Sequence, residues 1–341
     1  MNSFGRIFRV SIFGESHGEN VGVIIDGCPG GMSLKIEDFS PDLERRKAGA
    51  KGTTPRKEDD IPEIVSGVFN DKTTGAPITI LFKNSNTRSG DYEKQRAVPR
   101  PGHADFVASK KFDGFQDYRG GGHFSGRLTV ALVAAGIVAK KILDLIPNPS
   151  PKERGIKITA TILEIGGETD LDKGLQKAID AKDSIGGIIE CRVDGLPIGL
   201  GEPFFDSAES LLSHAVFAIP AVRAIEFGTG FAAAKMFGSK HNDAIEDASG
   251  RTASNNAGGV VGGLTNGNEL VFRIAIKPTS STPQEQQTLN IETNKVEPFS
   301  VKGRHDLCIA LRVPVVLEAA TAIVLADLML LNKKIEQCSQ K

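Results

Sequence analysis

The chain has 341 residues, 40% of them hydrophobic and 24% charged, which is the balance of a soluble globular protein with a sizeable core. Its 41 basic and 42 acidic residues leave a formal net charge of −1, which argues against nucleic acid or an anionic membrane as the main partner. The four cysteines show no Cys-x-x-Cys or Cys/His spacing, so neither a metal site nor a disulfide framework is expected. The first residues lack the apolar core of a signal peptide, and together these features predict a cytoplasmic protein.

Alternating hydrophobic residues predict strands in the first part of the chain. The loop Gly-Glu-Ser-His-Gly at 14–18 separates the first two strands. Ser40-Pro41 is typical of a helix start, because a capping residue is followed by proline at the first helical position. The expected elements are strands at 7–13 and 21–26, a helix at 41–47, strands at 64–69 and 78–82, and a long apolar helix at 128–145.

The second half of the chain repeats this order of elements. The turn Asp26-Gly27-Cys28-Pro29 recurs as Asp194-Gly195-Leu196-Pro197, and the apolar helix after Arg127 recurs after Arg312. Chance similarity among glycine- and proline-rich turns is the alternative explanation. A ligand site between two such halves is expected. We predict one α/β domain of the α+β kind over residues 1–335, with pseudo-duplicated halves at 1–148 and 185–335 and a tail at 336–341.

Three further stretches carry predictions of their own. Residues 313–331 are long and apolar, but Glu318 and Asp327 interrupt them, which favours a buried core helix over a membrane span. Residues 47–60 are polar and rich in glycine and lysine, and Ser281–Lys302 is poor in hydrophobic residues. We expect a mobile loop at the first of these and a flexible lid at the second.

The window from Arg100 to Arg127 concentrates residues suited to binding an anion. It contains two of the six histidines, His103 and His123, and a glycine triplet at 120–122. Glycines let the backbone approach a ligand closely, and the helix that follows directs free N–H groups toward anions. We interpret this window as a phosphate-binding floor.

Other candidate residues come from separate loops. His17 is compatible with an exposed or capping residue, but histidine is also the side chain best suited to acid catalysis near neutral pH. Asp306, beside an arginine at a helix entry, is a candidate general base. Arg45 and Arg46 on one short helix can clamp an anion, and Lys277 to Ser281 offers an ammonium group, hydroxyls and N–H groups. These residues predict an enzyme that acts on a phosphorylated, multiply anionic small molecule without a metal.

Six motifs, in their order along the chain, resemble the chorismate synthase family. They are FGESHG at 13–18, RPGHAD at 100–105, DYRGGGHFSGR at 117–127, GLGEPFFD at 199–206, KPTSS at 277–281 and GRHD at 303–306. The resemblance implies a lyase that converts 5-enolpyruvylshikimate 3-phosphate to chorismate and phosphate by a trans-1,4 elimination that requires reduced FMN. It also implies a domain with helices sandwiched between antiparallel β-sheets, assembled as a homotetramer.

The resemblance also implies roles for individual residues. His17 would protonate the departing phosphate, His103 would stabilise or protonate reduced FMN, and Asp306 would help the flavin accept the C6 proton of the substrate. The phosphate and carboxylates of the substrate are expected at Arg45, Arg46 and Arg127. FMN is expected at His123, Phe124, Ser125, Ala221, Gly262, Lys277, Pro278, Thr279, Ser280, Ser281 and Arg304.

Arg46 and Lys51 match positions that the family associates with NADPH, here an indirect reductant of FMN. No flavin-reductase segment is evident, so an external flavin reductase is expected as a partner. Two other classes of protein stay open. A flavin-dependent oxidoreductase would use the same cofactors, whereas a nucleotide-binding regulatory protein would not need three histidines and an aspartate in glycine-lined loops.

Overall fold

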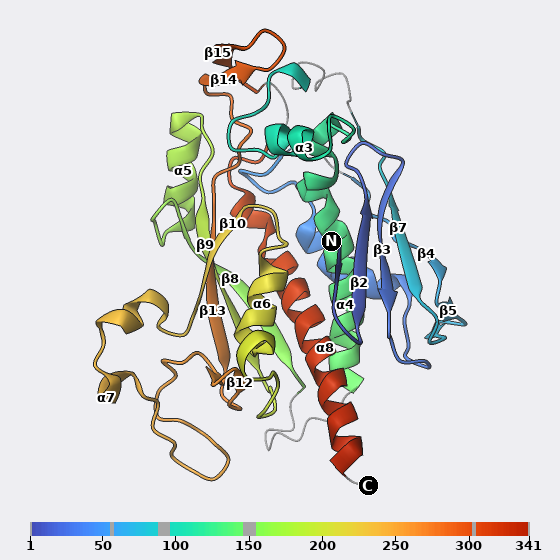
Figure 1. The fold of residues 1–341 in the computed structure, drawn as a ribbon, viewed down its shortest axis with the longest axis vertical. Coiled ribbons are helices and arrows are strands. Elements are labelled where there is room, and N and C mark those ends of the chain that lie inside the picture. Colours follow the sequence, from blue (N-terminus) through green and yellow to red (C-terminus); the bar gives the residue numbers. More distant parts are fainter. Residues whose placement is uncertain (1, 55–57, 88–95, 146–154, 302–304, 340–341) are drawn as a thin grey trace.

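The computed structural model describes residues 2–54, 58–87, 96–145, 155–301 and 305–339. Two antiparallel sheets enclose two long helices, α4 (Thr129–Leu145) and α8 (Pro314–Ser339) (Figure 1). The first sheet has the order β1 (Ser3–Phe4), β2 (Arg9–Gly14), β3 (Asn20–Asp26), β7 (Ile78–Lys83) and β4 (Glu63–Ser66). The second has the order β10 (Val222–Phe227), β13 (Leu270–Ile276), β9 (Gly187–Asp194) and β8 (Lys157–Ile165). The predicted sandwich of helices between antiparallel sheets is confirmed.

Shorter elements connect and cover this framework. The other helices are α1 (Ser40–Arg46), α3 (Asp105–Lys111), α5 (Leu171–Ala181), α6 (Ala208–Val216) and α7 (Gly238–His241). Short hairpins are formed by β5 (Val68–Phe69) with β6 (Lys72–Thr73), β11 (Val260–Val261) with β12 (Leu264–Thr265), and β14 (Gln286–Asn290) with β15 (Lys295–Phe299). Single 3-10 turns are η1 (Ile36–Phe39), η3 (Arg119–Phe124), η4 (Gly126–Leu128), η5 (Phe204–Asp206), η6 (Gly230–Lys235) and η7 (Ile309–Arg312).

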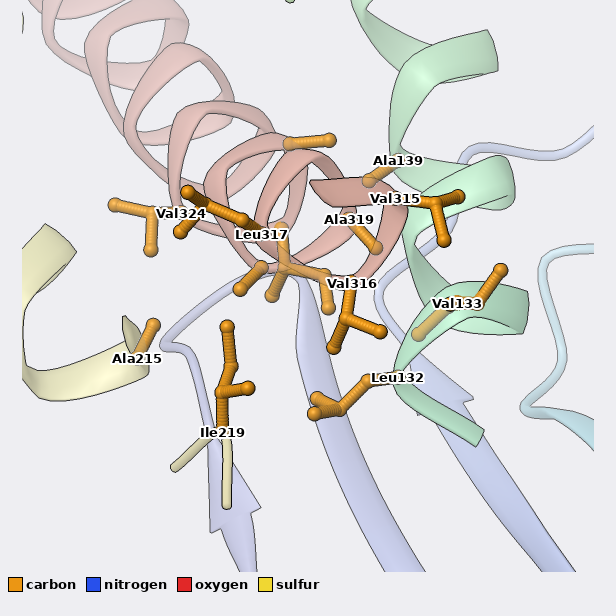
Figure 2. Close-up of a cluster of buried hydrophobic side chains, with 14 of the residues drawn as sticks. Leu132, Val133, Ala139, Ala215, Ile219, Val315, Val316, Leu317, Ala319 and Val324 are labelled. Atoms are coloured by element: carbon orange, nitrogen blue, oxygen red, sulfur yellow. The ribbon is translucent and has the colours of Figure 1, made fainter. Parts of the chain in front are cut away.

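The core is centred on the contact between α4 and α8. Every residue of α4 from Thr129 to Ala139 is buried, as expected of a helix that is apolar on all sides. Small residues allow the two helices to approach closely, since a Cβ on Gly136 would overlap Ala319 of α8. Figure 2 shows side chains of both helices meeting here, among them Leu132 and Val316.

Two carboxylates interrupt the apolar surface of α8, and both are buried. Asp327 accepts hydrogen bonds from the backbone N–H groups of Arg6 (2.9 Å), Ile7 (2.7 Å) and Phe8 (2.9 Å). The segment Pro314–Lys333 is long and apolar enough to cross a membrane, but 83% of its most apolar window is buried inside the protein. The prediction of a core helix is therefore confirmed.

The other carboxylate, Glu318, joins three separate parts of the chain to α8. It accepts two hydrogen bonds of 2.7 Å from Arg45, one of 3.2 Å from Lys140 and one of 3.1 Å from the N–H of Ala160. Burying a charge is unfavourable unless hydrogen bonds and an opposite charge compensate for it. Glu318 meets both conditions, so it acts as a connecting point within the core.

The two sheets share one topology. In chain order the first sheet uses β2, β3, β4 and β7, which lie in space as β2-β3-β7-β4. The second uses β8, β9, β10 and β13, which lie as β8-β9-β13-β10, so both place the fourth strand between the second and the third. A short helix precedes each third strand, and α4 and α8 follow the fourth strands. We propose on this basis that the halves are duplicates within one domain, the second beginning at β8 rather than near residue 185.

Two expected loops have more structure than their composition indicated. The segment Ser281–Lys302, where a flexible lid is expected, contains the β14–β15 hairpin, and its role as a lid stays a prediction. Thr288 of this hairpin donates to the carbonyl of Pro99 (2.8 Å). In the segment 47–60, of which 55–57 lie outside the described residues, the carbonyl of Gly52 accepts from the N–H of Leu307 (2.9 Å). Both segments are thus tied to a distant part of the chain.

Candidate active site

A cavity of about 720 Å³ lies between the two halves, which is the size of sites that hold a cofactor and a small substrate. Part of its wall is apolar and is formed by Val10, Leu132, Ile219, Val316 and Ile323, three of which appear in Figure 2. Its polar wall draws on both halves, and the ionisable residues in it are Arg46, Lys47, Glu58, Asp60, Arg100, His103, His123, Arg127, His214, Lys277, His305, Asp306 and Arg312. The excess of basic side chains suits an anionic ligand.

The glycine triplet at 120–122 brings two predicted catalytic histidines close together. All three glycines have positive φ angles, 61°, 83° and 54°. A side chain on the first would overlap the ring of His17, and a Cβ on the second would lie 3.1 Å from the ring of His103. The N–H of Ser16 donates to the third glycine (3.1 Å) and holds the loop of His17 against the triplet. Glycine is required here both by backbone conformation and by space.

His103 belongs to a hydrogen-bonded group with Arg100 and Asp105. Its Nδ1 lies 2.6 Å from Oδ1 of Asp105, and the same carboxylate accepts from Nε (2.7 Å) and Nη2 (2.8 Å) of Arg100. Although burial acts to raise the pKa of Asp105, hydrogen bonds from Arg100 and His103 hold it well below its usual range. A charged carboxylate at Nδ1 orients the ring and leaves Nε2 free for chemistry.

A second charged group surrounds Asp60, which is buried between the guanidinium groups of Arg46 and Arg127 and pairs with both. Nε of Arg127 also donates to Asn84 (2.9 Å), and Nη1 of Arg46 lies 3.4 Å from the hydroxyl of Thr129. Burial acts to raise the pKa of Asp60, but the two arginines lower it below its usual range. The carboxylate of Glu58 also acts on both arginines, and the guanidinium group of Arg312 acts on Arg46. Three positive charges therefore face two negative ones, and this cluster suits an anion.

Asp306 is held from two sides. Its Oδ1 accepts from the N–H of Thr54 (2.9 Å), and its Oδ2 lies 3.4 Å from Nη1 of Arg312. Nε of Arg312 also donates to the carbonyl of Arg46 (3.1 Å), which connects this carboxylate to the arginine cluster. Asp306 therefore lines the cavity in a fixed orientation although it lies outside any helix or strand.

The loop at 277–281 forms another side of the cavity. Nζ of Lys277 donates to the carbonyl of Gly102 (2.5 Å) and lies 2.9 Å from the hydroxyl of Ser280. Burial, and next to it the charge of Arg223, lower the pKa of Lys277. The backbone N–H of Lys277 donates to Ala221, which has a positive φ of 75°, a strained conformation for alanine. Such strain is often found beside functional sites.

The turn that follows the glycine triplet also lines the cavity. Nδ1 of His123 donates to the carbonyl of Gly14 (2.7 Å), and the hydroxyl of Ser125 accepts from the N–H of Arg127 (3.3 Å). Phe124 is 41% exposed beside them. These three residues, with Ala221 and Pro278, lie where the sequence predicted a cofactor site.

Four predicted site residues lie outside the cavity wall. His17 is buried behind the triplet, and Arg45 is engaged with Glu318. Nζ of Lys51 lies 3.5 Å from Oε1 of Gln176 on an exposed surface. Gly262 occupies the turn of the β11–β12 hairpin. Arg304 lies outside the described residues. The roles predicted for these five residues stay predictions.

Several residues of the site were missed from the sequence. Arg100 and Asp105 flank His103 within one motif, so their spacing was a usable signal. Asp60 lies in a polar segment that resembles a surface loop, and Arg312 was noted only as a helix boundary. Asp60 is not marked locally, because its partner Arg127 lies 67 residues away. Arg312 lies six residues after its partner Asp306, but its contact with Arg46 spans 266 residues.

Three buried polar atoms of the wall have no hydrogen-bond partner among the described residues. They are Nε of Arg46, Oγ1 of Thr279 and Nε2 of His305. A buried polar group without a partner costs about 1–3 kcal/mol, so the wall is suited to a ligand that provides partners. Within the described residues no group of three or more His, Cys, Asp or Glu side chains is arranged to hold a metal ion. The three polar atoms without hydrogen-bond partners suit a polar organic ligand.

Comparison with known proteins identifies the family. The chorismate synthase family model matches residues 8–330. The chain is 70% identical over 334 residues to a chorismate synthase of Chitinophaga pinensis, with 98% of each chain covered, and 39% identical to that of Methanocaldococcus jannaschii, with 99% of each covered. A crystal structure of a chorismate synthase superposes with a TM-score of 0.71 at 26% identity and covers 97% of this chain and 93% of its own. This chain belongs to the chorismate synthase family.

Proposed function

We propose that this chain converts 5-enolpyruvylshikimate 3-phosphate to chorismate and phosphate with reduced FMN as cofactor. As a member of the chorismate synthase family it is a carbon–oxygen lyase of the shikimate pathway, which serves aromatic amino acid biosynthesis. One observation carries the proposal for this site. The wall of the cavity has more basic than acidic side chains, and three of its buried polar atoms have no hydrogen-bond partner among the described residues. A substrate with one phosphate and two carboxylates matches such a wall.

FMN fits the part of the cavity between the glycine triplet and the loop at 277–281. Oγ1 of Thr279 is unpartnered there, and the hydroxyls of Ser125 and Ser281 and the ammonium group of Lys277 suit the phosphate and ring atoms of a flavin. Reduced FMN would supply electrons for an elimination that has no net redox change. The strained backbone at Ala221 would allow close approach to its ring system.

The substrate would bind at the arginine cluster. Arg46 and Arg127 are fixed by Asp60, so little conformational entropy is lost when they bind an anion. Each charge-assisted hydrogen bond contributes about 1.5–3 kcal/mol. Arg45, which is engaged with Glu318, would act by holding α1 and therefore Arg46 in place.

The acid and base functions lie on different sides of the cavity. His17 would give a proton to the leaving phosphate, and His103, oriented by Asp105, would act on reduced FMN. Asp306 would take up the proton that leaves C6 of the substrate. A positioned general acid or base contributes roughly 10²–10⁴-fold to the rate. The reach of His17 into the cavity depends on movement of the loop at 14–18.

Four finer features belong to the same proposal. NADPH would serve as an indirect reductant near Arg46 and Lys51, and an external flavin reductase would deliver the reduced cofactor in the cytoplasm. Homotetramer formation would cover apolar side chains that a single chain exposes. The most exposed of these are Phe115 (92%), Phe205 (92%), Phe204 (85%), Phe237 (83%) and Phe231 (80%).

The direct test is anaerobic mixing of the protein with dithionite-reduced FMN and the enolpyruvyl substrate, followed by chorismate absorbance and phosphate release. We expect many chorismates per reduced flavin and one phosphate per chorismate. One flavin equivalent consumed per turnover would support a flavin-dependent oxidoreductase instead. No chorismate under these conditions would contradict the proposal.

A further inference from the structure

A second cavity of about 400 Å³ adjoins the first. Among the described residues, Ser281, His305 and Asp306 line both cavities and so form the partition between them. The wall of the second cavity also contains Pro283 and Ser300, which are exposed, so this cavity reaches the protein surface. Solvent can therefore approach Asp306 from the side opposite the substrate cavity.

His305 lies at this partition, and the proposed function assigns it no step of the reaction. Its Nε2 is buried and has no hydrogen-bond partner among the described residues, although it lines a cavity full of charged groups. Burial and the positive charge of Arg100 lower the pKa of His305, while Asp306 acts in the opposite direction. The imidazole is therefore neutral near pH 7, when it accepts a proton and releases it readily.

The proposed reaction leaves a proton imbalance within the enzyme. In each turnover a C–H bond and the C–O bond to phosphate break, and a C=C bond forms, so no oxidant is consumed. At the end of a turnover Asp306 holds the proton from carbon, whereas the phosphate has taken a proton from His17. Before the next turnover Asp306 must lose one proton and His17 must gain one.

We propose that His305 carries the proton from Asp306 to solvent in the second cavity and so resets the base after each turnover. This inference rests on the proposed function and on the geometry of the partition. The ring accepts the proton at one nitrogen and releases the proton held by the other, which leaves the second neutral tautomer, and proton exchange with water in the second cavity restores the first. Arg100 and Asp306 are the charged groups that act on this histidine within the described part of the chain.

The test compares first and later turnovers of His305→Ala and His305→Asn, in the full chain with reduced FMN and a low buffer concentration. The first turnover is measured at saturating substrate and FMN, where a loss of ligand affinity does not lower the rate. It needs no reset, so we expect its rate within about threefold of the wild type. Later turnovers should be slower by roughly 10–100-fold, since a proton-transfer group is lost. Added imidazole should restore them, because a small diffusible base can enter the surface cavity. His305→Asn keeps a polar side chain should the alanine variant fail to fold.

His241→Ala is the matched control, because this histidine lies at the end of α7 outside both cavities and should show no buffer dependence. Equal slowing of first and later turnovers, or no response to imidazole, would assign His305 a structural role and overturn the inference. Unchanged later turnovers at low buffer would overturn it as well. Failure of the proposed function is distinguishable, because the wild type would then form no chorismate at all.

Discussion

Carboxylates in two regions of this molecule, three of them buried and Asp306 half-buried, have the same chemistry but different surroundings. In α8, Glu318 and Asp327 are surrounded by donors from the chain itself, and Asp327 alone accepts three backbone N–H groups. At the cavity, Asp60 and Asp306 are also paired with arginines, but those arginines line the cavity, where a ligand can bind. The difference indicates that a buried charge stabilises the fold where its partners are complete, and serves a ligand where its partners retain free capacity.

The largest effect is expected at Asp306. Asp306→Asn keeps an oxygen for the N–H of Thr54 but removes the basic carboxylate, so kcat should fall roughly 10²–10⁴-fold. Affinity for the substrate should change little, because the arginines are untouched. Steady-state kinetics with reduced FMN measures both constants. A loss confined to KM would instead make Asp306 a group that positions the substrate.

Asp327 tests the other side of the comparison. Asp327→Ala removes the acceptor of three backbone N–H groups, of which that of Phe8 is buried, and we expect the free energy of unfolding to fall by about 3–5 kcal/mol. Asp327→Asn is the matched control, because the amide oxygen can still accept hydrogen bonds from the N–H groups of Ile7 and Phe8. The free energy of unfolding should therefore fall less in this variant than in Asp327→Ala. Urea denaturation followed by circular dichroism measures both. Equal losses would show that these hydrogen bonds are not the source of the stabilisation.

An intermediate effect is expected at Asp105, which contacts His103, the side chain proposed to act on reduced FMN. Asp105→Asn should lower kcat roughly 10–100-fold through misorientation of His103, with FMN affinity kept. The lowered pKa also predicts that its contribution to stability is complete above the ordinary value of about 3.9 and is lost as pH falls toward the folded value. Acid denaturation of the variant should therefore be less steep. An unchanged kcat would show that Asp105 is not needed to orient His103.

The sequence predicted the framework well because its signals are local. Apolar periodicity placed both core helices, and two carboxylates within 313–331 indicated burial rather than a membrane span. His103 and His123 were recognisable because glycines and arginines surround them in the sequence. Asp60 and Arg312 were not recognisable, since each gains its role from partners many residues away. The β14–β15 hairpin was missed because its polar strands lack an apolar face.

The smallest effect is expected from a substitution in the core that changes none of these carboxylates or their partners. Gly136→Ala places a methyl group against Ala319 and should lower the free energy of unfolding by about 1–3 kcal/mol through overpacking. Turnover of the folded protein should be unchanged, because the wall of the cavity stays in place. A melting temperature equal to that of the wild type would show that α4 and α8 can separate without cost.

The most direct test of the comparison is the turnover number per folded molecule of Asp306→Asn and Asp327→Asn, measured side by side. The folded fraction of each is determined by denaturation in the assay buffer. We expect Asp327→Asn to keep its turnover within about threefold of the wild type, and Asp306→Asn to lose roughly 10²–10⁴-fold. Equal losses per folded molecule in both variants would contradict the division between carboxylates that hold the fold and carboxylates that serve the reaction.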